Sequence, residues 1–255
     1  MDWRKKTNCE RNGREMYEMI EELGSGSFGR VDGVKAKLNG NIYALKTCQL
    51  NSLTEKLKIN VLNETQNLIK LRSKYVIQYY YSWIESNCLY ILMECLAGNL
   101  TQVLETKRKL FGEIITDFEF YISYEIFKQL VESVEYLHKN HINHRDLKPD
   151  NVLIDNNDDN RYIKLCDFGL SKEVHVLSDG YNQTKDVGDI QYQAPEAITT
   201  EYNHLIDVYS LALIGAQLFG FNTRDIANGN TQRMDRRIGD KDPNVKSNFY
   251  TNGFN

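Results

Sequence analysis

The chain has 255 residues, and its 41% of hydrophobic side chains is enough to bury one substantial core. Because 31 basic and 35 acidic residues leave a formal net charge of −4, neither a nucleic acid nor a membrane surface is expected as a partner. No stretch approaches the roughly 20 apolar residues of a membrane span. The five cysteines lack the spacing of a zinc site or a disulfide framework, which predicts a reducing compartment, the cytoplasm or the nucleus.

The first half of the chain predicts a sheet with one helix. Five strands are expected, at residues 17–23, 31–38, 42–47, 76–84 and 89–93, with hairpin turns at Asn39-Gly40 and Glu85-Ser86-Asn87. Between the third and fourth strands, Ser52 and Glu55 have the spacing of a capping box. Five side chains then follow at helical spacing: Leu57, Val61, Glu64, Leu68 and Leu71.

The second half predicts mainly helices. Thr116 and Glu119 form another capping-box pattern, and one face of a long helix follows with Ile122, Ile126, Leu130, Val134 and Leu137. Two short strands are expected at residues 152–154 and 162–166, and a buried helix at 208–219. The fold class is therefore α+β in two parts, with a boundary near Ala97-Gly98.

A glycine-rich loop follows the first expected strand. Glycines at this spacing let the main chain approach phosphate groups, because no Cβ blocks positive φ or close contact. The pattern alone also opens dinucleotide-binding folds, but there a helix would follow at once. Here a second strand and a turn follow, so we expect a flap over the phosphates of a nucleotide. The loop comprises Gly24, Ser25, Gly26, Ser27, Phe28, Gly29, Arg30 and Val31.

Two charged residues interrupt apolar elements. Lys46 lies in the expected strand 42–47, where the alternative is a lysine at a sheet edge that reaches to water. Glu64 lies on the apolar face of the expected helix, and a carboxylate there costs free energy unless it is paired. An ion pair between Lys46 and Glu64 satisfies both side chains and would aim the ammonium group at the phosphates of ATP.

The strongest signal is the segment His-Arg-Asp-Leu-Lys-Pro-Asp-Asn at residues 144–151, followed by Asp167-Phe168-Gly169. Phosphoryl transfer needs a group that orients the attacking hydroxyl and accepts its proton, a cation near the moving phosphate, and oxygen ligands for Mg²⁺. Asp146 is the candidate base and Lys148 the candidate cation. Asn151 and Asp167 are the candidate ligands for Mg²⁺, so the sequence predicts a site that uses ATP and Mg²⁺.

With these motifs in this order, the chain resembles the eukaryotic protein kinases over residues 17–219. Ala194-Pro195-Glu196 is similar to the end of the family's activation segment, and Asp207 lies where its buried helix begins. The resemblance implies a bilobal kinase domain at residues 17–255, preceded by an extension at 1–16. Its parts are an N-lobe at 17–96, a C-lobe at 97–219 that is shortened relative to the family, and an atypical polar tail at 220–255.

The resemblance also assigns residues to the nucleotide. It places four side chains around the adenine: Leu23, Val31, Ala44 and Leu153. It makes Met93 the gatekeeper and brings the main chain of Glu94 and Leu96 to the purine edge.

Substrate class and regulation are implied in the same way. Lys148, two residues after Asp146, resembles the serine/threonine branch of the family, while tyrosine or dual specificity stays open. Arg145, directly before Asp146, is similar to the arginine of kinases whose activation loop is ordered by phosphorylation. The resemblance implies phosphorylation of that loop, either by another kinase or by the chain itself. The candidate acceptors are Ser178, Tyr181 and Thr184.

A finer resemblance lies in the aromatic run at residues 79–85 and the segment 89–95. These are similar to the kinases of the alpha subunit of translation initiation factor two and to the Wee-type kinases, and the alternative is an aromatic strand that packs on the core of its lobe. His138, His141 and His144 are spaced by three, but a helix end and the catalytic segment explain them better than a metal site does.

Two departures from the family bear on activity. Asp189 replaces the usual threonine, whose hydroxyl links the residues equivalent to Asp146 and Lys148; we expect an aspartate to pair with Lys148 and to repel Asp146. The second departure is the polar tail, because the family has further helices after the position of residue 219, including an arginine that pairs with the glutamate corresponding to Glu196. Arg233, Arg236 and Arg237 of the tail are candidates for that arginine. An active serine/threonine kinase is therefore the main hypothesis, and an ATP-binding pseudokinase or scaffold with weak or no turnover is the alternative.

Overall fold

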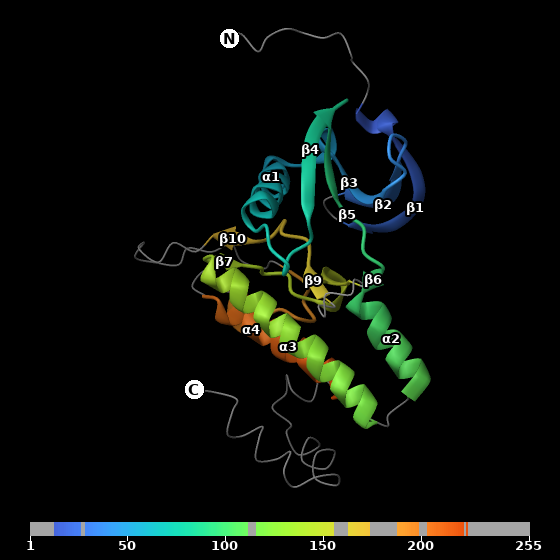
Figure 1. The fold of residues 1–255 in the computed structure, drawn as a ribbon. Coiled ribbons are helices and arrows are strands. Elements are labelled where there is room, and N and C mark those ends of the chain that lie inside the picture. Colours follow the sequence, from blue (N-terminus) through green and yellow to red (C-terminus); the bar gives the residue numbers. More distant parts are fainter. Residues whose placement is uncertain are drawn as a thin grey trace.

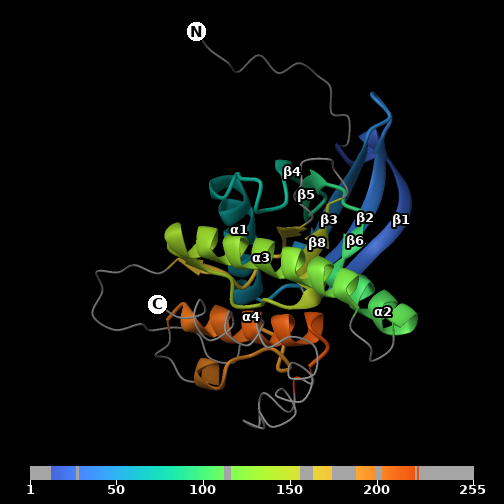
Figure 2. The same cartoon turned by 60° about the horizontal axis from the view of Figure 1, so that its bottom comes forward.

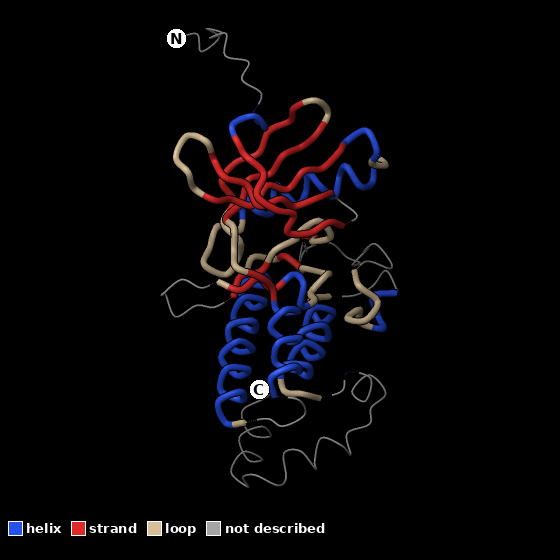
Figure 3. The backbone as a smooth tube through the Cα atoms, turned by 90° about the vertical axis from the view of Figure 1, so that its right-hand side faces the viewer, coloured by secondary structure: helices blue, strands red, loops and turns tan. Residues whose placement is uncertain are grey.

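The computed structural model describes residues 13–26, 29–111, 116–155, 163–173, 188–198, 203–221 and 223. A β-sheet with one helix packed against it forms one part, and a mainly helical region forms the other (Figures 1 and 3). The predicted α+β architecture in two parts is confirmed.

The sheet of the first part is antiparallel in the order β1-β2-β3-β5-β4. Its strands are β1 (Tyr17–Gly26), β2 (Gly29–Ala36), β3 (Ile42–Gln49), β4 (Tyr79–Glu85) and β5 (Cys88–Glu94). The glycine-rich loop forms the tip of the first hairpin, since Gly24 pairs with Val31 and Gly26 with Gly29. This loop therefore continues a hairpin, as predicted, and does not open a helix.

The two predicted hairpin turns differ in outcome. Ser86 and Asn87 connect β4 to β5 with φ of 48° and 62°, which is typical of a tight two-residue turn. The hairpin at Asn39-Gly40 is also formed, since β2 and β3 pair antiparallel on either side of it, but its turn is longer than expected because residues 37–41 all lie between the two strands. Gly40 adopts φ of 73° within this longer turn, and its N–H donates to the carbonyl of Ala36 at 2.8 Å.

Helix α1 (Glu55–Lys70) begins later than its expected cap. Ser52 lies in a short 3-10 turn (Leu50–Ser52), and Leu53 behind it is extended, so a capping box at Ser52 is wrong. Thr54 is the N-cap instead, and its Oγ1 accepts a hydrogen bond from the N–H of Leu57 at 3.4 Å. The predicted buried face of α1 is confirmed at Val61, Glu64 and Leu68, so the carboxylate of Glu64 is buried as expected.

The second part is built on two helices that pack side by side, α3 (Asp117–Lys139) and α4 (Leu205–Leu218) (Figure 2). Thr116 caps α3 as predicted, because its Oγ1 accepts from the N–H of Glu119 at 3.2 Å. Short strands connect this part: β6 (Gly98–Asn99) with β8 (Val152–Ile154) and β9 (Ile163–Leu165), and β7 (Ile142–Asn143) with β10 (Lys172–Glu173). Two 3-10 turns lie at Pro149–Asn151, the end of the segment 144–151, and at Pro195–Ile198.

Helix α2 (Leu100–Phe111) is an element that the sequence analysis did not predict. Its cap is nevertheless visible in the sequence: Asn99 Oδ1 accepts from the N–H of Gln102, and Gln102 Oε1 accepts from the N–H of Asn99, both at 3.1 Å. Near its other end, Lys107 pairs with Glu119 of α3 at 3.0 Å. This ion pair fixes α2 against α3.

Two aromatic residues of β4 and β5, Trp83 and Tyr90, pack in a second, smaller apolar cluster, whereas Tyr79 of β4 belongs to the main core. The ring of Trp83 stacks on Tyr17 and Tyr90, with centroids 6.1 Å and 4.9 Å away. Together with buried Val34 and Leu45 they form a small core of their own. The aromatic run therefore has a packing role in this lobe, whatever it contributes to subfamily.

Candidate active site

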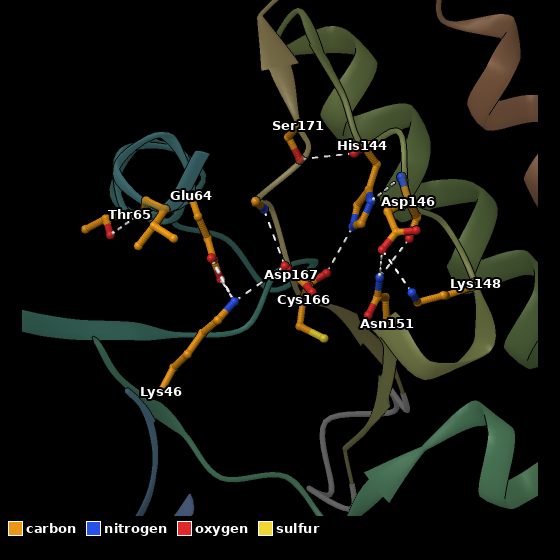
Figure 4. A network of polar contacts seen from close by, with 12 residues as sticks. Lys46, Glu64, Thr65, His144, Asp146, Lys148, Asn151, Cys166, Asp167 and Ser171 are labelled. Atoms are coloured by element: carbon orange, nitrogen blue, oxygen red, sulfur yellow. Dashed lines mark hydrogen bonds and ion pairs between the residues drawn. The ribbon is translucent and has the colours of Figure 1, made fainter. Parts of the chain in front are cut away.

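Charged side chains from both parts of the fold converge on one region (Figure 4). Lys46 comes from β3 and Glu64 from α1. Asp146, Lys148 and Asn151 come from the segment between β7 and β8, and Asp167 follows β9. The structure thus brings together all six residues to which the sequence analysis assigned catalytic or metal-binding roles.

The predicted ion pair between Lys46 and Glu64 is formed and buried. Lys46 Nζ lies 2.7 Å from both carboxylate oxygens of Glu64 and 3.5 Å from Asp167 Oδ1. Burial alone would lower the pKa of Lys46, but the carboxylates of Glu64 and Asp167 outweigh it and raise that pKa. The ammonium group therefore stays charged at neutral pH, and it links the sheet to the helical part.

Asp146 is held by three donors on its two carboxylate oxygens. Asn151 Nδ2 donates to Oδ2 at 3.0 Å, and Lys148 Nζ lies 3.1 Å from the same oxygen. The main-chain N–H of Asp189 donates to Oδ1 at 3.0 Å. Since charge-assisted hydrogen bonds fix geometry strongly, this carboxylate has one defined orientation.

Asn151 and Asp167 present oxygen atoms suited to a hard cation. The Nδ2 group of Asn151 donates to the main-chain and side-chain oxygens of Asp146, which leaves its Oδ1 as a ligand atom. The Asp167 side chain keeps 32% of its surface exposed. Burial alone would raise the pKa of Asp167, but Lys46 and His144 outweigh it and lower that pKa, so the carboxylate is ionised. One carboxylate and one amide oxygen fit Mg²⁺.

Asp207 has a structural task that the sequence analysis did not assign. This residue of α4 is 1% exposed, and its carboxylate accepts from the N–H groups of His144 at 2.8 Å and Arg145 at 2.9 Å. His138 Nε2 lies 2.9 Å from the same carboxylate. A carboxylate at the start of an apolar helix was the available signal, because such a charge must find partners.

Replacing Asp207 with alanine should disorder the catalytic segment, because two buried N–H groups lose their acceptor. We expect a loss of stability of about 2–4 kcal/mol in urea unfolding. Asp207→Asn keeps one acceptor oxygen and should lose less. Equal stability of the alanine variant and the parent chain would contradict this role.

The three histidines do not gather around a metal position. His138 binds Asp207, and His144 Nε2 lies 3.0 Å from the carbonyl oxygen of Cys166. Within the described ranges, no three His, Cys, Asp or Glu side chains are placed to hold a metal ion. The ring of His144 instead packs on buried Phe168, with centroids 5.0 Å apart.

The residues assigned to the adenine line the junction of the two parts. Ala44 and Met93 are register partners on β3 and β5 and are both buried, whereas Val31 and Leu153 are partly buried against the same core. Leu23 lies on β1 just before the glycine-rich loop, and it is 44% exposed.

The strand β5 ends in an ion-pair network that the sequence analysis missed. Lys164 Nζ lies 2.7 Å from Glu94 Oε2 and 3.0 Å from Asp155 Oδ2. It thereby ties the end of β5 to the paired strands β8 and β9. Its signal was a lysine between two buried residues of a short strand, Ile163 and Leu165.

The expected attraction between Asp189 and Lys148 is present as a charge effect. Burial alone would lower the pKa of Lys148, but the carboxylates of Asp146 and Asp189 outweigh it and raise that pKa. The hydrogen-bonding partners are others: Lys148 pairs with Asp146, and Asp189 Oδ1 accepts from the N–H of Gln191 at 2.9 Å. The main-chain N–H of Asp189 donates to Asp146, while the repulsion between the two carboxylates stays a prediction.

Several expectations lie outside the described residues. They concern Ser27 and Phe28 of the glycine-rich loop, the acceptors Ser178, Tyr181 and Thr184, and the arginines Arg233, Arg236 and Arg237. For the described helices, none is long and apolar enough to cross a bilayer.

A two-part α+β fold that brings a lysine–glutamate pair together with a hydrogen-bonded aspartate and asparagine is typical of a phosphotransferase domain. The chain belongs to the protein kinase family: the family profile described as "Protein kinase domain" matches residues 17–246. This match extends beyond residue 219, where the resemblance noted in the sequence stopped.

Individual relatives agree with this assignment. The chain is 34% identical to the interferon-induced, double-stranded RNA-activated protein kinase of Rattus norvegicus, over 79% of this chain and 40% of that protein. It is 34% identical to the probable serine/threonine-protein kinase nek3 of Dictyostelium discoideum, over 78% of this chain and 18% of nek3. It is 35% identical to the serine/threonine-protein kinase cot-1 of Neurospora crassa, over 67% and 27%. The chain thus spans 40% or less of each of these relatives.

Proposed function

We propose that this chain transfers the γ-phosphoryl group of ATP to serine or threonine hydroxyls of protein substrates. The observation that carries the proposal is that both halves of one site are complete. Lys46, paired with Glu64, contacts Asp167, while Lys148 and Asn151 orient Asp146. A protein that had lost phosphoryl transfer would have no need to keep both halves in register.

Each residue has a role in this proposal. Asp146 orients the acceptor hydroxyl and takes its proton, and its fixed carboxylate lowers the cost of reaching the attack geometry. Lys148 offsets the negative charge that builds up beside Asp146. Lys46 contacts the phosphates of ATP, held in place by Glu64.

Asn151 Oδ1 and the Asp167 carboxylate would hold Mg²⁺. When bound, the ion neutralises phosphate oxygens and so reduces repulsion against the incoming hydroxyl. Asp167 is suited to this because its ionised state is favoured.

The glycine-rich hairpin and the junction of the two parts would hold the rest of the nucleotide. Gly24, Ser25, Gly26, Gly29 and Arg30 form the described part of the flap, which would cover the phosphates. The adenine would lie between Leu23, Val31, Ala44 and Leu153, beside Met93. The N–H of Glu94 donates to the carbonyl of Gln78 at 2.9 Å, so its own carbonyl and the main chain of Leu96 are the groups proposed for the purine edge.

The acceptor residue and the substrate are finer proposals. Serine or threonine is supported by Lys148 and by two relatives named as serine/threonine-protein kinases. The resemblance of the aromatic run to kinases of the alpha subunit of initiation factor two predicts that subunit as the substrate.

Regulation by phosphorylation also stays a proposal. Lys172 and Arg145 lie close enough that burial and the charge of Arg145 lower the pKa of Lys172. Two neighbouring cations suit a phosphate group.

The free cysteines Cys48, Cys88, Cys95 and Cys166 fit the reducing cytoplasm or nucleus proposed for the chain.

The test of the proposed function is a transfer assay with radiolabelled ATP and Mg²⁺, followed by phosphoamino-acid analysis. The chain should label a generic basic protein and itself on serine or threonine. Labelled tyrosine would overturn the substrate class. Thermal stabilisation by ATP without any transfer would support the pseudokinase alternative instead.

A further inference from the structure

Asp189 stands where the family usually has threonine, and its geometry gives this departure a task. Its N–H donates to Asp146 Oδ1 at 3.0 Å. Asn151 and Lys148 both act on the other oxygen, Oδ2. The Asp189 N–H thus fixes Oδ1, the oxygen that Asn151 and Lys148 do not contact.

The turn that presents this N–H is closed by the Asp189 side chain. Asp189 Oδ1 accepts from the N–H of Gln191 at 2.9 Å, two residues on, and the carbonyl of Asp189 accepts from the N–H of Tyr192 at 2.9 Å. An aspartate that accepts from residue i+2 forms an Asx turn, which sets the direction of its own main chain. The direction of the Asp189 N–H therefore depends on its carboxylate.

The same turn is anchored to α4. Tyr192 donates from its hydroxyl to Gln217 Oε1 at 2.9 Å, and the carbonyl of Tyr192 accepts from Ser210 Oγ at 2.7 Å. Asp207, also on α4, holds the main chain of the catalytic segment next to Asp146. Helix α4 thus holds both the turn that contains Asp189 and the main chain directly before Asp146.

Close packing leaves this turn little freedom. Gly188 has φ of 97°, and a Cβ there would lie 2.5 Å from the carbonyl oxygen of Arg145 and 3.4 Å from Asp146 Oδ1. Any larger residue at 188 would push the turn away from Asp146. Glycine at 188 and aspartate at 189 together place the donor.

We propose that Asp189 is a positioning residue for phosphoryl transfer, whose carboxylate closes the Asx turn that aims its main-chain N–H at Asp146. It does by a main-chain donor what the threonine hydroxyl does elsewhere in the family. The proposal rests on the proposed function of Asp146, and it removes the reason to regard Asp189 as a sign of inactivity.

Kinetics of three variants test this role. Asp189→Ala opens the turn and should lower kcat about 5- to 10-fold with little change in KM for ATP, as for the loss of one capping hydrogen bond. Asp189→Asn keeps the acceptor oxygen, and so should recover most of that loss. Gly188→Ala should lower kcat further than Asp189→Ala. Thermal melting of each variant shows that the fold is retained.

Two kinetic results would overturn the proposal. If Asp189→Asn is as slow as Asp189→Ala, the charge matters and the turn does not. If Asp189→Ala matches the parent chain in kcat, the residue positions nothing.

A spectroscopic readout separates this proposal from the proposed function. In protein labelled with ¹⁵N-aspartate, the Asp189 amide should exchange slowly with D₂O, and Asp146→Ala should speed that exchange, because the N–H loses its acceptor. This result stands even for a chain without turnover. An Asp189 amide that exchanges equally fast in the parent chain and in Asp146→Ala would overturn the contact.

Discussion

Replacing Asp146 with asparagine is expected to lower kcat about 10³-fold, within the range for the loss of a general base. Asparagine keeps the size of the side chain and an acceptor for Lys148, but it cannot take the proton of the attacking hydroxyl. Because the contacts from Asn151 and Asp189 reach oxygens of this side chain, we expect a small loss of stability beside the large loss of rate. Initial rates at saturating ATP and thermal melting measure the two effects.

Asp150→Asn is the matched control for this variant. Asp150 lies in the same segment, is exposed, and accepts a hydrogen bond from Thr101 Oγ1 at 2.9 Å. It should change kcat far less than Asp146→Asn does. If both variants kept kcat within about threefold of the parent chain, about 0.7 kcal/mol in barrier height, Asp146 would not be the base.

Removing Lys46 should have the largest effect on stability. Lys46→Met leaves Glu64 buried without its cation, which costs about 3–5 kcal/mol, and it also removes the contact with Asp167. Transfer should fall below detection, because the proposed link to the phosphates is lost with the ammonium group. Urea unfolding and the transfer assay measure the two effects separately.

The double variant Lys46→Met with Glu64→Leu makes this prediction specific. Two apolar side chains in place of a buried ion pair should restore most of the stability while activity stays lost. Lys58→Met is the surface control: it breaks the exposed pair with Glu55 at 2.7 Å and should cost about 0.5 kcal/mol or less. A single Lys46→Met variant as stable as Lys58→Met would mean that the pair with Glu64 contributes little.

Local patterns in the sequence determined a large part of this protein. The pair of Lys46 and Glu64 was predictable because each residue breaks an apolar pattern, and a buried charge must have a partner. The segment at residues 144–151 and Asp167-Phe168-Gly169 named the remaining site residues by chemistry and order alone. The cap at Thr116 and the turn at Ser86-Asn87 followed from side-chain and main-chain preferences within a few residues.

Errors of the sequence analysis arose where local signals compete or are weak. Ser52 and Thr54 both have capping side chains, and the extended Leu53 between them decided for Thr54. Helix α2 was overlooked because its Asn99 and Gln102 cap is a less familiar form of the capping box.

Only the tertiary structure decided the supports around Asp146. The carboxylate of Asp207 reaches residues 62 and 63 positions earlier in the chain, and the N–H of Asp189 reaches one 43 positions earlier. No periodicity reports such contacts, because they depend on how α4 packs against α3 and on the direction of single N–H groups. Composition and motif order therefore identified a kinase domain, whereas the packing of α4 showed how its proposed base is held and gave Asp189 a task.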